Sequence, residues 1–433
     1  MKNYLLISAF GLALLVYACS YDEVKDPTDF QLRKAIDKAS PTGSYEHFIL
    51  PSETDFANIP QEPKNPLNTA KVALGKMLFY ETGIALEPKY PEGMLSYSCA
   101  SCHIPEAGFM PGRAQGIADG GTGFGINGEG RVKFIFYGND EPDVQGARAL
   151  NVCNVAFVPN TTWAGMFGGT GINVGTESQW TGDLTTNFLG MQGLESQALA
   201  VQKVHRMIMN ETIADTLGYK NLFDAAFTDF PASERYSATT TAFAEGAYLR
   251  TLIPNRAPFQ KWLKGEQTAM TEQEKRGAML FFTKAGSYKC HNGEALHNAT
   301  LFAAVGVKDL YETGQAIKTD VHDKRNLGRG GFTGKADDMF KFKVPQLYNM
   351  HGGSHYFHGS SKRRLRQVVE YFNAAVPENG RVPEEQLAPQ FRPLHLSKDE
   401  IDDLAAFLEN GLYDHEMSRY VPENVMSGYC FPN

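Results

Sequence analysis

Residues 97–103 read Tyr-Ser-Cys-Ala-Ser-Cys-His, and the rest of the chain is organised around them. Two cysteines three positions apart can add their sulfurs to the two vinyl groups of one haem. The small residues between them allow a short turn that brings Cys99, Cys102 and His103 to the same haem. The stretch is therefore a c-type haem attachment motif, with two covalent anchors and a histidine that binds the iron.

A zinc or redox Cys-x-x-Cys site is the alternative interpretation of this motif. A structural zinc ion needs a second pair of ligands, and the six cysteines of the chain form no second Cys-x-x-Cys. The histidine directly after Cys102 completes the haem pattern, so the sequence favours haem.

Composition sets the class of protein. The 433 residues are enough for two to three domains with a sizeable core. Hydrophobic residues make up 42% and charged residues 21%, which is typical of soluble proteins. The net charge of −8 argues against a nucleic-acid partner, because phosphate binding requires clustered Lys and Arg. The short basic run at residues 362–364 is interpreted as a solvated loop or a docking rim.

Residues 1–19 have the pattern of a bacterial lipoprotein signal. Lys2 supplies a positive start, and the apolar stretch 5–16 is too short to span a bilayer as a stable helix. Tyr17 is bulky for such a signal, so an ordinary signal peptide cut nearby is the alternative. Both interpretations predict export to the periplasm or cell envelope. The first also predicts a lipid anchor on Cys19 as the only membrane attachment.

Residues 20–65 are charged, contain proline and lack a strong periodicity, apart from a short predicted helix at residues 30–39. We interpret residues 20–65 as a tether. The globular part opens at residues 70–80, where the apolar side chains fall on one helical face.

Leu74–Phe79, followed by Ser98–Phe109, resembles the N-terminal haem domain of the bacterial dihaem cytochrome c peroxidase and MauG-type family. Further segments of that pattern, in the family's order, are Asn154–Phe157, Trp163–Gly165, Leu194–Ala198, Arg250–Leu252, Pro258–Gly265, Phe342–Asn349 and His355–Gly359. The similarity covers about residues 60–415, and its specificity lies in the order of many short motifs.

The resemblance implies a mainly α fold with two cytochrome-c-like haem domains after a signal peptide and a tether. The predicted ranges are 1–19 for the lipoprotein signal peptide, 20–65 for the tether, 66–266 for the N-terminal haem domain and 267–433 for a C-terminal domain with a degenerate haem motif. Near the end of the second domain, Ser397 and Glu400 predict the capping box of a helix.

The residues on the open side of the first haem depart from the family pattern. No histidine occurs between His103 and His205, so the sixth position of this iron is predicted to be open or held by water. Gln197 matches a family glutamine, whereas the family's glutamate position holds Arg206. Peroxide cleavage requires a base and a donating group, which His205 and Arg206 can supply. The alternative is that His205 is a surface histidine without a role.

The second haem motif is half removed. Ser287 stands where the family carries the first cysteine, while Cys290 and His291 are kept. A serine hydroxyl is a poor nucleophile for a haem vinyl group. The site therefore holds haem by one thioether through Cys290 with His291 as axial ligand, holds it without a covalent bond, or has lost it; we favour retained haem.

The opposite ligand of the second iron is also altered. The resemblance places it at Phe372, which cannot bind a metal. Tyr371 is one residue away, a rotation of about 100° on a helix, and is the predicted metal ligand after a shift in register. His351, His355 and His358 are alternatives, or else hydrogen-bonded loop residues.

The resemblance implies that a tryptophan passes electrons between the two haems. Trp163 lies at the spacing that the family pattern requires, and Trp180 is the rival. Packing of either ring in the core is the alternative interpretation.

The activity that the resemblance implies is reduction of hydrogen peroxide, with electrons from a donor cytochrome or cupredoxin. A MauG-type haem enzyme that oxidises a partner protein is the first alternative, and a non-catalytic electron-transfer cytochrome is the second. The expected cofactor is haem c at one or both motifs, and the resemblance also allows a calcium ion.

Overall fold

The structure is a computed structural model that describes residues 27–431. Its helices are α2 (Pro27–Ala39), α3 (Thr69–Tyr80), α4 (Gly193–Val204), α5 (Glu211–Thr216), α6 (Lys220–Ala226), α7 (Ala238–Arg250), α8 (Pro258–Leu263), α9 (Glu272–Phe282), α10 (Arg329–Thr333), α11 (Leu365–Ala374) and α12 (Lys398–Ala406). In this part of the chain, strands are limited to two short antiparallel pairs: β1 (Gly121–Thr122) with β2 (Val132–Lys133), and β3 (Phe302–Ala303) with β4 (Phe342–Lys343). The prediction of a mainly α fold is confirmed.

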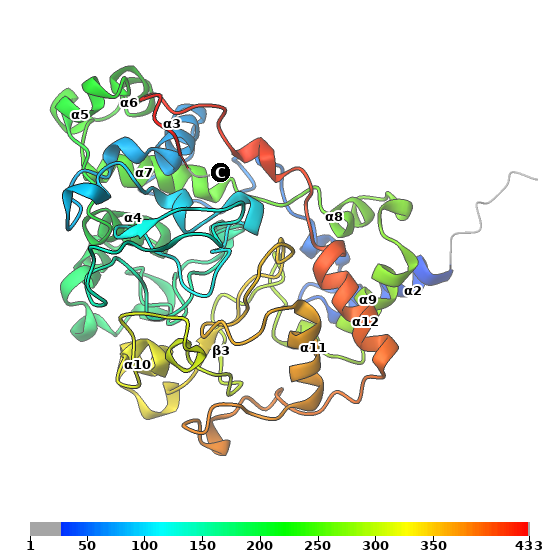
Figure 1. The fold of residues 1–433 in the computed structure, drawn as a ribbon. Coiled ribbons are helices and arrows are strands. Elements are labelled where there is room, and N and C mark those ends of the chain that lie inside the picture. The colour runs from blue at the N-terminus through cyan, green and yellow to red at the C-terminus, as the bar shows by residue number, and fades with distance from the viewer. Residues whose placement is uncertain (1–26, 432–433) are drawn as a thin grey trace, which may run out of the picture.

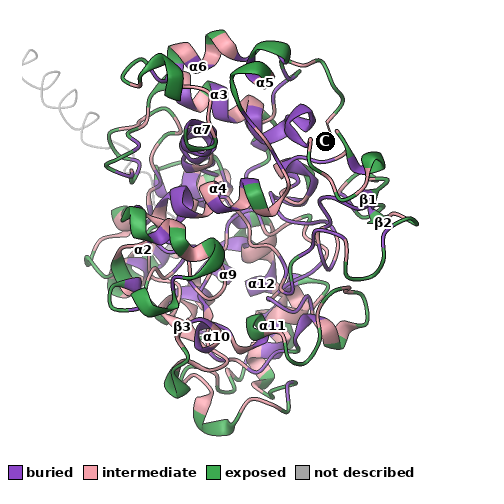
Figure 2. Cartoon of the chain, turned by 90° about the vertical axis from the view of Figure 1, so that its left-hand side faces the viewer, coloured by how far each residue is buried: buried purple, intermediate pink, exposed green. Residues whose placement is uncertain are grey.

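The helices form two lobes (Figure 1). Helices α3 to α7 lie together in the first lobe, and α2, α8, α9, α11 and α12 lie in the second. Helix α7 is buried along most of its length in the core of the first lobe (Figure 2). Each lobe carries one of the two haem motifs on the segment that follows its α3 or α9 helix.

The two lobes repeat one helix crossing. A Cβ atom on Gly75 of α3 would lie 1.8 Å from the carbonyl oxygen of Ala244 in α7. A Cβ atom on Gly277 of α9 would lie 2.0 Å from the carbonyl oxygen of Asp403 in α12. Because no other residue lacks Cβ, glycine permits both close crossings. Each haem motif therefore follows a helix held tightly against a later helix of its own lobe.

The predicted capping box at the start of α12 is confirmed. The Ser397 side chain accepts a hydrogen bond from the Glu400 backbone, and the Glu400 carboxylate accepts one from the Ser397 backbone at 2.8 Å. These reciprocal bonds satisfy two amide groups that the first helical turn leaves free.

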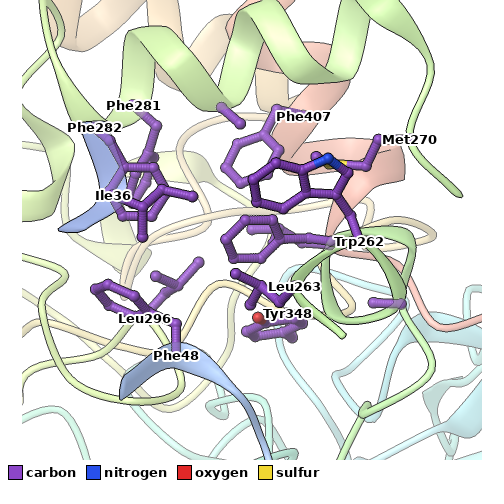
Figure 3. Packing of buried hydrophobic residues seen from close by; sticks show 14 of the residues in the cluster. Ile36, Phe48, Trp262, Leu263, Met270, Phe281, Phe282, Leu296, Tyr348 and Phe407 are labelled. Carbon is purple, nitrogen blue, oxygen red and sulfur yellow. The ribbon is translucent and has the colours of Figure 1, made fainter. Parts of the chain in front are cut away.

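The prediction that residues 20–65 form a tether is wrong for the described part, residues 27–65. Helix α2 buries Leu32 and Ile36 in the core of the second lobe, where Phe48 also lies. Figure 3 shows Ile36 and Phe48 in this core. The carboxylate of Asp29 accepts a hydrogen bond from the indole of Trp262 at 2.6 Å. Leu32 and Ile36 are four positions apart and share one helical face, a pattern that the charged neighbours obscured. The predicted signal peptide and Cys19 lie outside the described residues.

Both predicted domain boundaries near the second lobe also need correction. Phe259 and Trp262 of α8 stack with an interplanar angle of 9° in the core of the second lobe, so that lobe begins before residue 267. Figure 3 shows Trp262 in this core. At the other end, Met417 and Tyr420 pack with Phe79 in the first lobe. Each lobe is therefore completed by a segment distant in sequence. Helix α2 packs in the second lobe, and Met417 and Tyr420 pack in the first. No helix among residues 27–431 is long and apolar enough to cross a membrane.

Candidate active site

The first haem motif presents its three reactive side chains from one short turn. Residues Cys99–Ser101 form a 3-10 turn, which Ser98 caps through a hydrogen bond from its backbone to the Ser101 hydroxyl at 3.0 Å. Cys99 and Cys102 are free, half-buried thiols. A Cβ atom on Gly116 would lie 2.6 Å from the Cys102 sulfur, so glycine is required beside it.

His103 is oriented for metal binding. Its Nδ1 donates to the carbonyl oxygen of Phe109 at 3.3 Å, which leaves Nε2 for a metal. Burial lowers the pKa of His103 to about 4, so the imidazole is neutral near pH 7, the form that binds iron. The residues of this motif therefore fit a covalently bound c-type haem.

His205 lies at the end of α4 and is paired with Asp143. Its Nδ1 donates to Oδ2 of Asp143 at 2.5 Å. Burial lowers the pKa of His205, but the charge and the hydrogen bond of Asp143 outweigh burial, so the pKa lies above its ordinary value. The hydroxyl of Tyr97, in the first motif, donates to the carbonyl of Arg206, the residue after His205, at 3.2 Å, so His205 lies near this motif. His205 is therefore no isolated surface histidine.

Glu245 is a second acidic group at this site, and sequence reasoning missed it. This α7 residue is 3% exposed, and its Oε1 lies 3.9 Å from the Cys99 sulfur. Burial raises the pKa of Glu245 to about 8, although Cys99 and His205 act to lower it. The carboxyl group is therefore protonated near pH 7. The sequence does mark this residue, because Glu245 is the one charged residue among the small and apolar residues 242–247.

The other two predicted catalytic residues are less well placed. The guanidinium of Arg206 forms an ion pair with the buried carboxylate of Asp119 and donates to the Glu141 carbonyl at 3.2 Å. Its charge is thus already paired, which argues against the predicted donor role. Gln197 is half-buried on α4, about two turns before His205.

The second motif lines a large, mainly apolar cavity in the second lobe, with about 1750 Å3 of empty space including its mouth. Ser287, Cys290 and His291 all line it. Nδ1 of His291 donates to the Leu296 carbonyl at 3.0 Å, and burial lowers the pKa of His291 to about 4. His291 thus repeats the arrangement of His103. The cavity, one cysteine and the oriented histidine fit a haem held by a single thioether.

The prediction that Tyr371 binds the second metal is wrong. Its hydroxyl donates to the Val305 carbonyl at 2.6 Å, and its ring packs against Phe391 at a centroid distance of 5.3 Å. Phe372, the neighbouring residue, lines the cavity instead. The register of α11 is therefore the one that the family pattern implies, without the shift that Tyr371 would need.

The three alternative histidines behave as hydrogen-bonded or surface loop residues. His355 shares a hydrogen bond of 2.7 Å with the Ser354 hydroxyl, and His358 is 3.0 Å from Oδ1 of Asp309. His351 is half-exposed, 3.9 Å from Glu409. His358 nevertheless lines the cavity.

Trp163 lies between the two motifs. It lines the cavity of the second lobe, and its indole donates to the Arg148 carbonyl at 2.7 Å. The guanidinium of Arg148 donates to the Pro111 carbonyl at 2.6 Å, which connects it to the loop that follows the first motif. Trp180 instead packs on Phe188 at a centroid distance of 5.0 Å and is absent from the cavity lining. The placement favours Trp163, and its role in electron transfer stays a prediction.

The two lobes and their motifs define a c-type haem protein of the two-domain class. Residues 69–268 match the sequence model of the family described as di-haem cytochrome c peroxidase. The chain is 27% identical to cytochrome-c peroxidase IdrP1 of Denitromonas iodatirespirans over 370 residues, which is 81% of this chain and 84% of that protein. It is also 27% identical to methylamine utilization protein MauG of Methylorubrum extorquens, over 81% of each chain.

Solved structures show the same fold. A MauG-like protein associated with microbial copper homeostasis matches with a TM-score of 0.58 and 23% identity, over 85% of this chain and 95% of that one. The Y463M variant of the diheme peroxidase BthA from Burkholderia thailandensis matches with a TM-score of 0.51 and 18% identity, over 82% and 89%.

Residues 69–268 match the di-haem cytochrome c peroxidase family, and the relatives that match most of the chain are cytochrome-c peroxidases and MauG proteins, which makes the chain a haem-dependent oxidoreductase. This similarity implies haem c as the cofactor. Calcium stays a prediction: residues 27–431 contain no group of three or more His, Cys, Asp and Glu side chains arranged to hold a metal ion.

Proposed function

We propose that this protein reduces hydrogen peroxide to water at the first motif, with haem attached to Cys99 and Cys102 and bound through His103. The observation that carries the proposal is the pair of proton-holding groups beside that motif, His205 with Asp143, and Glu245. When bound, the haem supplies the iron at which peroxide binds and which takes up the electrons. The protein supplies the protons.

The proton balance matches these groups. One hydrogen peroxide, two protons and two electrons give two waters, so two protons must reach the site for each turnover. Because the Asp143 carboxylate can only accept, Nδ1 of His205 keeps its proton and Nε2 is the atom that exchanges protons. Neutral His205 takes a proton from peroxide at Nε2 and returns it to the leaving oxygen. Glu245 delivers one of the two consumed protons from its carboxyl group, is protonated again from solvent, and then delivers the second.

Electrons are proposed to enter at the second motif and pass Trp163. The cavity beside His291, the retained Cys290 and the bridge from Trp163 to Arg148 support this route. The proposed donor is a small cytochrome or a cupredoxin. We further propose export to the periplasm or cell envelope, with Cys19 as a lipid anchor, on the sequence pattern of residues 1–19 alone.

The test is peroxide turnover by protein matured with c-type haem machinery, using a reduced small cytochrome as donor. Replacing His205 by Gln should lower kcat by about 100- to 10,000-fold, the usual contribution of a general acid–base group. His322, an exposed histidine far from His205 in sequence, provides the His322→Gln control. Equal turnover by the two variants would remove His205 from the mechanism.

A MauG-type oxidation of a partner protein is the second candidate. The 27% identity to a MauG protein, and the absence of histidine between His103 and His205, favour it. Peroxide consumption that oxidises a protein partner, without turnover of the small cytochrome, would support this candidate over the first. No reaction with peroxide would support a non-catalytic electron carrier.

A further inference from the structure

A polar cleft lies beside the loop that follows the first haem motif. It lies between the loop 112–114, which follows the first motif, and residues 354–363 of the second lobe. The cleft holds about 790 Å3 of empty space including its mouth, and its charged lining residues are Arg113, Arg363 and Glu129. Just beside it, Met110 and Tyr356 of the same two loops line the cavity of the second motif.

His355 fixes one of these arginines over the cleft. Its Nδ1 donates to the Ser354 hydroxyl, which donates to the Gly112 carbonyl, and its Nε2 accepts from the guanidinium of Arg363. Burial, Arg363, Arg148 and Arg113, in that order, lower the pKa of His355 to about 3. The imidazole of His355 is therefore neutral and holds the Arg363 guanidinium in place. Three arginines act on it.

These positive charges lack acidic partners at the cleft. Within the described chain, Nε and Nη1 of Arg113 are buried without a hydrogen-bond partner, as is Nε of Arg148. Arg363 donates to the neutral His355. Glu129 is the only acidic group of the lining. Its carboxylate accepts hydrogen bonds from the backbone of Ile126 at 3.1 Å and of Asn127 at 2.7 Å, so it stabilises its own loop and pairs with neither arginine. Buried guanidinium nitrogens without partners are costly, so a missing anion is the simplest account of them.

The position and charge of the cleft indicate which chemical class of ligand it binds. Gly112 and Arg113 line the cleft, and Gly116 of the same loop packs against the Cys102 sulfur, so the cleft adjoins the first motif as well as the second cavity. Guanidinium groups bind carboxylate and phosphate oxygens in a bidentate manner.

We propose that Arg113 and Arg363 form an anion-binding site for a carboxylate or phosphate group. The anion has two sources: a propionate of a bound haem, or a small free anion from solution. The proposal requires bound haem only for the first source, and it does not depend on peroxide reduction.

The test compares Arg113→Gln and Arg363→Gln with Arg364→Gln in the haem-loaded protein. Arg364 is the exposed neighbour of Arg363 and does not line the cleft, so it controls for loss of charge on this loop. Two quantities are measured: haem reduction potentials by spectroelectrochemical titration, and inorganic phosphate binding by calorimetry. Equal haem content and circular dichroism show that each variant folds.

Each source predicts its own result. If a propionate fills the cleft, phosphate does not bind. Both cleft variants then lower a haem reduction potential relative to Arg364→Gln, because loss of a cation favours the oxidised haem. If a free anion fills it, phosphate binds the parent protein and each cleft variant weakens binding about tenfold or more, with potentials unchanged. Cleft variants that match Arg364→Gln in both measurements would overturn the proposal.

Discussion

Asp143→Asn removes the negative charge that faces His205. The carboxylate is buried and lies 2.5 Å from Nδ1 of the imidazole, so little solvent screens the pair. A hydrogen bond between charged groups contributes about 1.5–3 kcal/mol, which changes the population of protonated His205 by a factor of about 10 to 160. Without the carboxylate, burial dominates, and the pKa of His205 falls.

Asp143→Asn also changes how stability and turnover depend on pH. His205 has a raised pKa in the folded protein, so its pairing with Asp143 stabilises the fold fully below the ordinary value of 6.5. That stabilisation is lost as the pH rises through the higher folded-state pKa. In Asp143→Asn this pH-dependent part of the unfolding free energy disappears. Because neutral His205 is the proposed base, the rise of peroxide turnover with pH, which follows deprotonation of His205, moves to lower pH.

The assay is kcat/KM for peroxide across pH, together with urea unfolding at several pH values. Asp140→Asn is the matched control, because Asp140 is an exposed aspartate of the same loop. The reasoning is refuted if Asp143→Asn keeps the pH profile and the pH dependence of unfolding shown by Asp140→Asn. A uniform loss of activity without a shifted profile would instead indicate a structural role for Asp143.

Three further changes test the rest of the site. Glu245→Gln should abolish a spectroscopic transition of the haem with an apparent pKa of about 8. It should also abolish the decline in unfolding free energy as the pH rises from 4.5 toward that value. Glu92→Gln, at an exposed glutamate, should change neither property. Cys290→Ser should remove one haem from the intact mass of the denatured protein, and an unchanged mass would show that no thioether forms there. Trp163→Phe should slow electron delivery in stopped-flow mixing with reduced donor, whereas Trp180→Phe should not; equal rates would exclude the proposed route.

Local features of the molecule were predictable. The turn at residues 99–103 and the capping box of Ser397 and Glu400 involve neighbours within a few positions, so spacing and residue type determine them. The mainly helical fold and the haem motif follow from the same kind of pattern. The altered second motif, Cys290 and His291 without a first cysteine, is likewise visible in the chain alone.

The predictions that failed depended on burial. Residues 27–65 have a charged composition, and only the packing of Leu32 and Ile36 in the second lobe shows that they are part of a core. Tyr371 and Phe372 are adjacent in sequence, so the direction of each side chain required the position of α11 against its neighbours.

The sequence by itself determined where haem can attach, because the attachment motif consists of cysteine and histidine at fixed local spacing. Only the tertiary structure decided which groups handle protons there. It brings Asp143 to His205 across 62 residues, and it buries Glu245 beside Cys99 across 146. The physical reason is that burial and the approach of charges set a pKa, and both arise only when distant segments pack together.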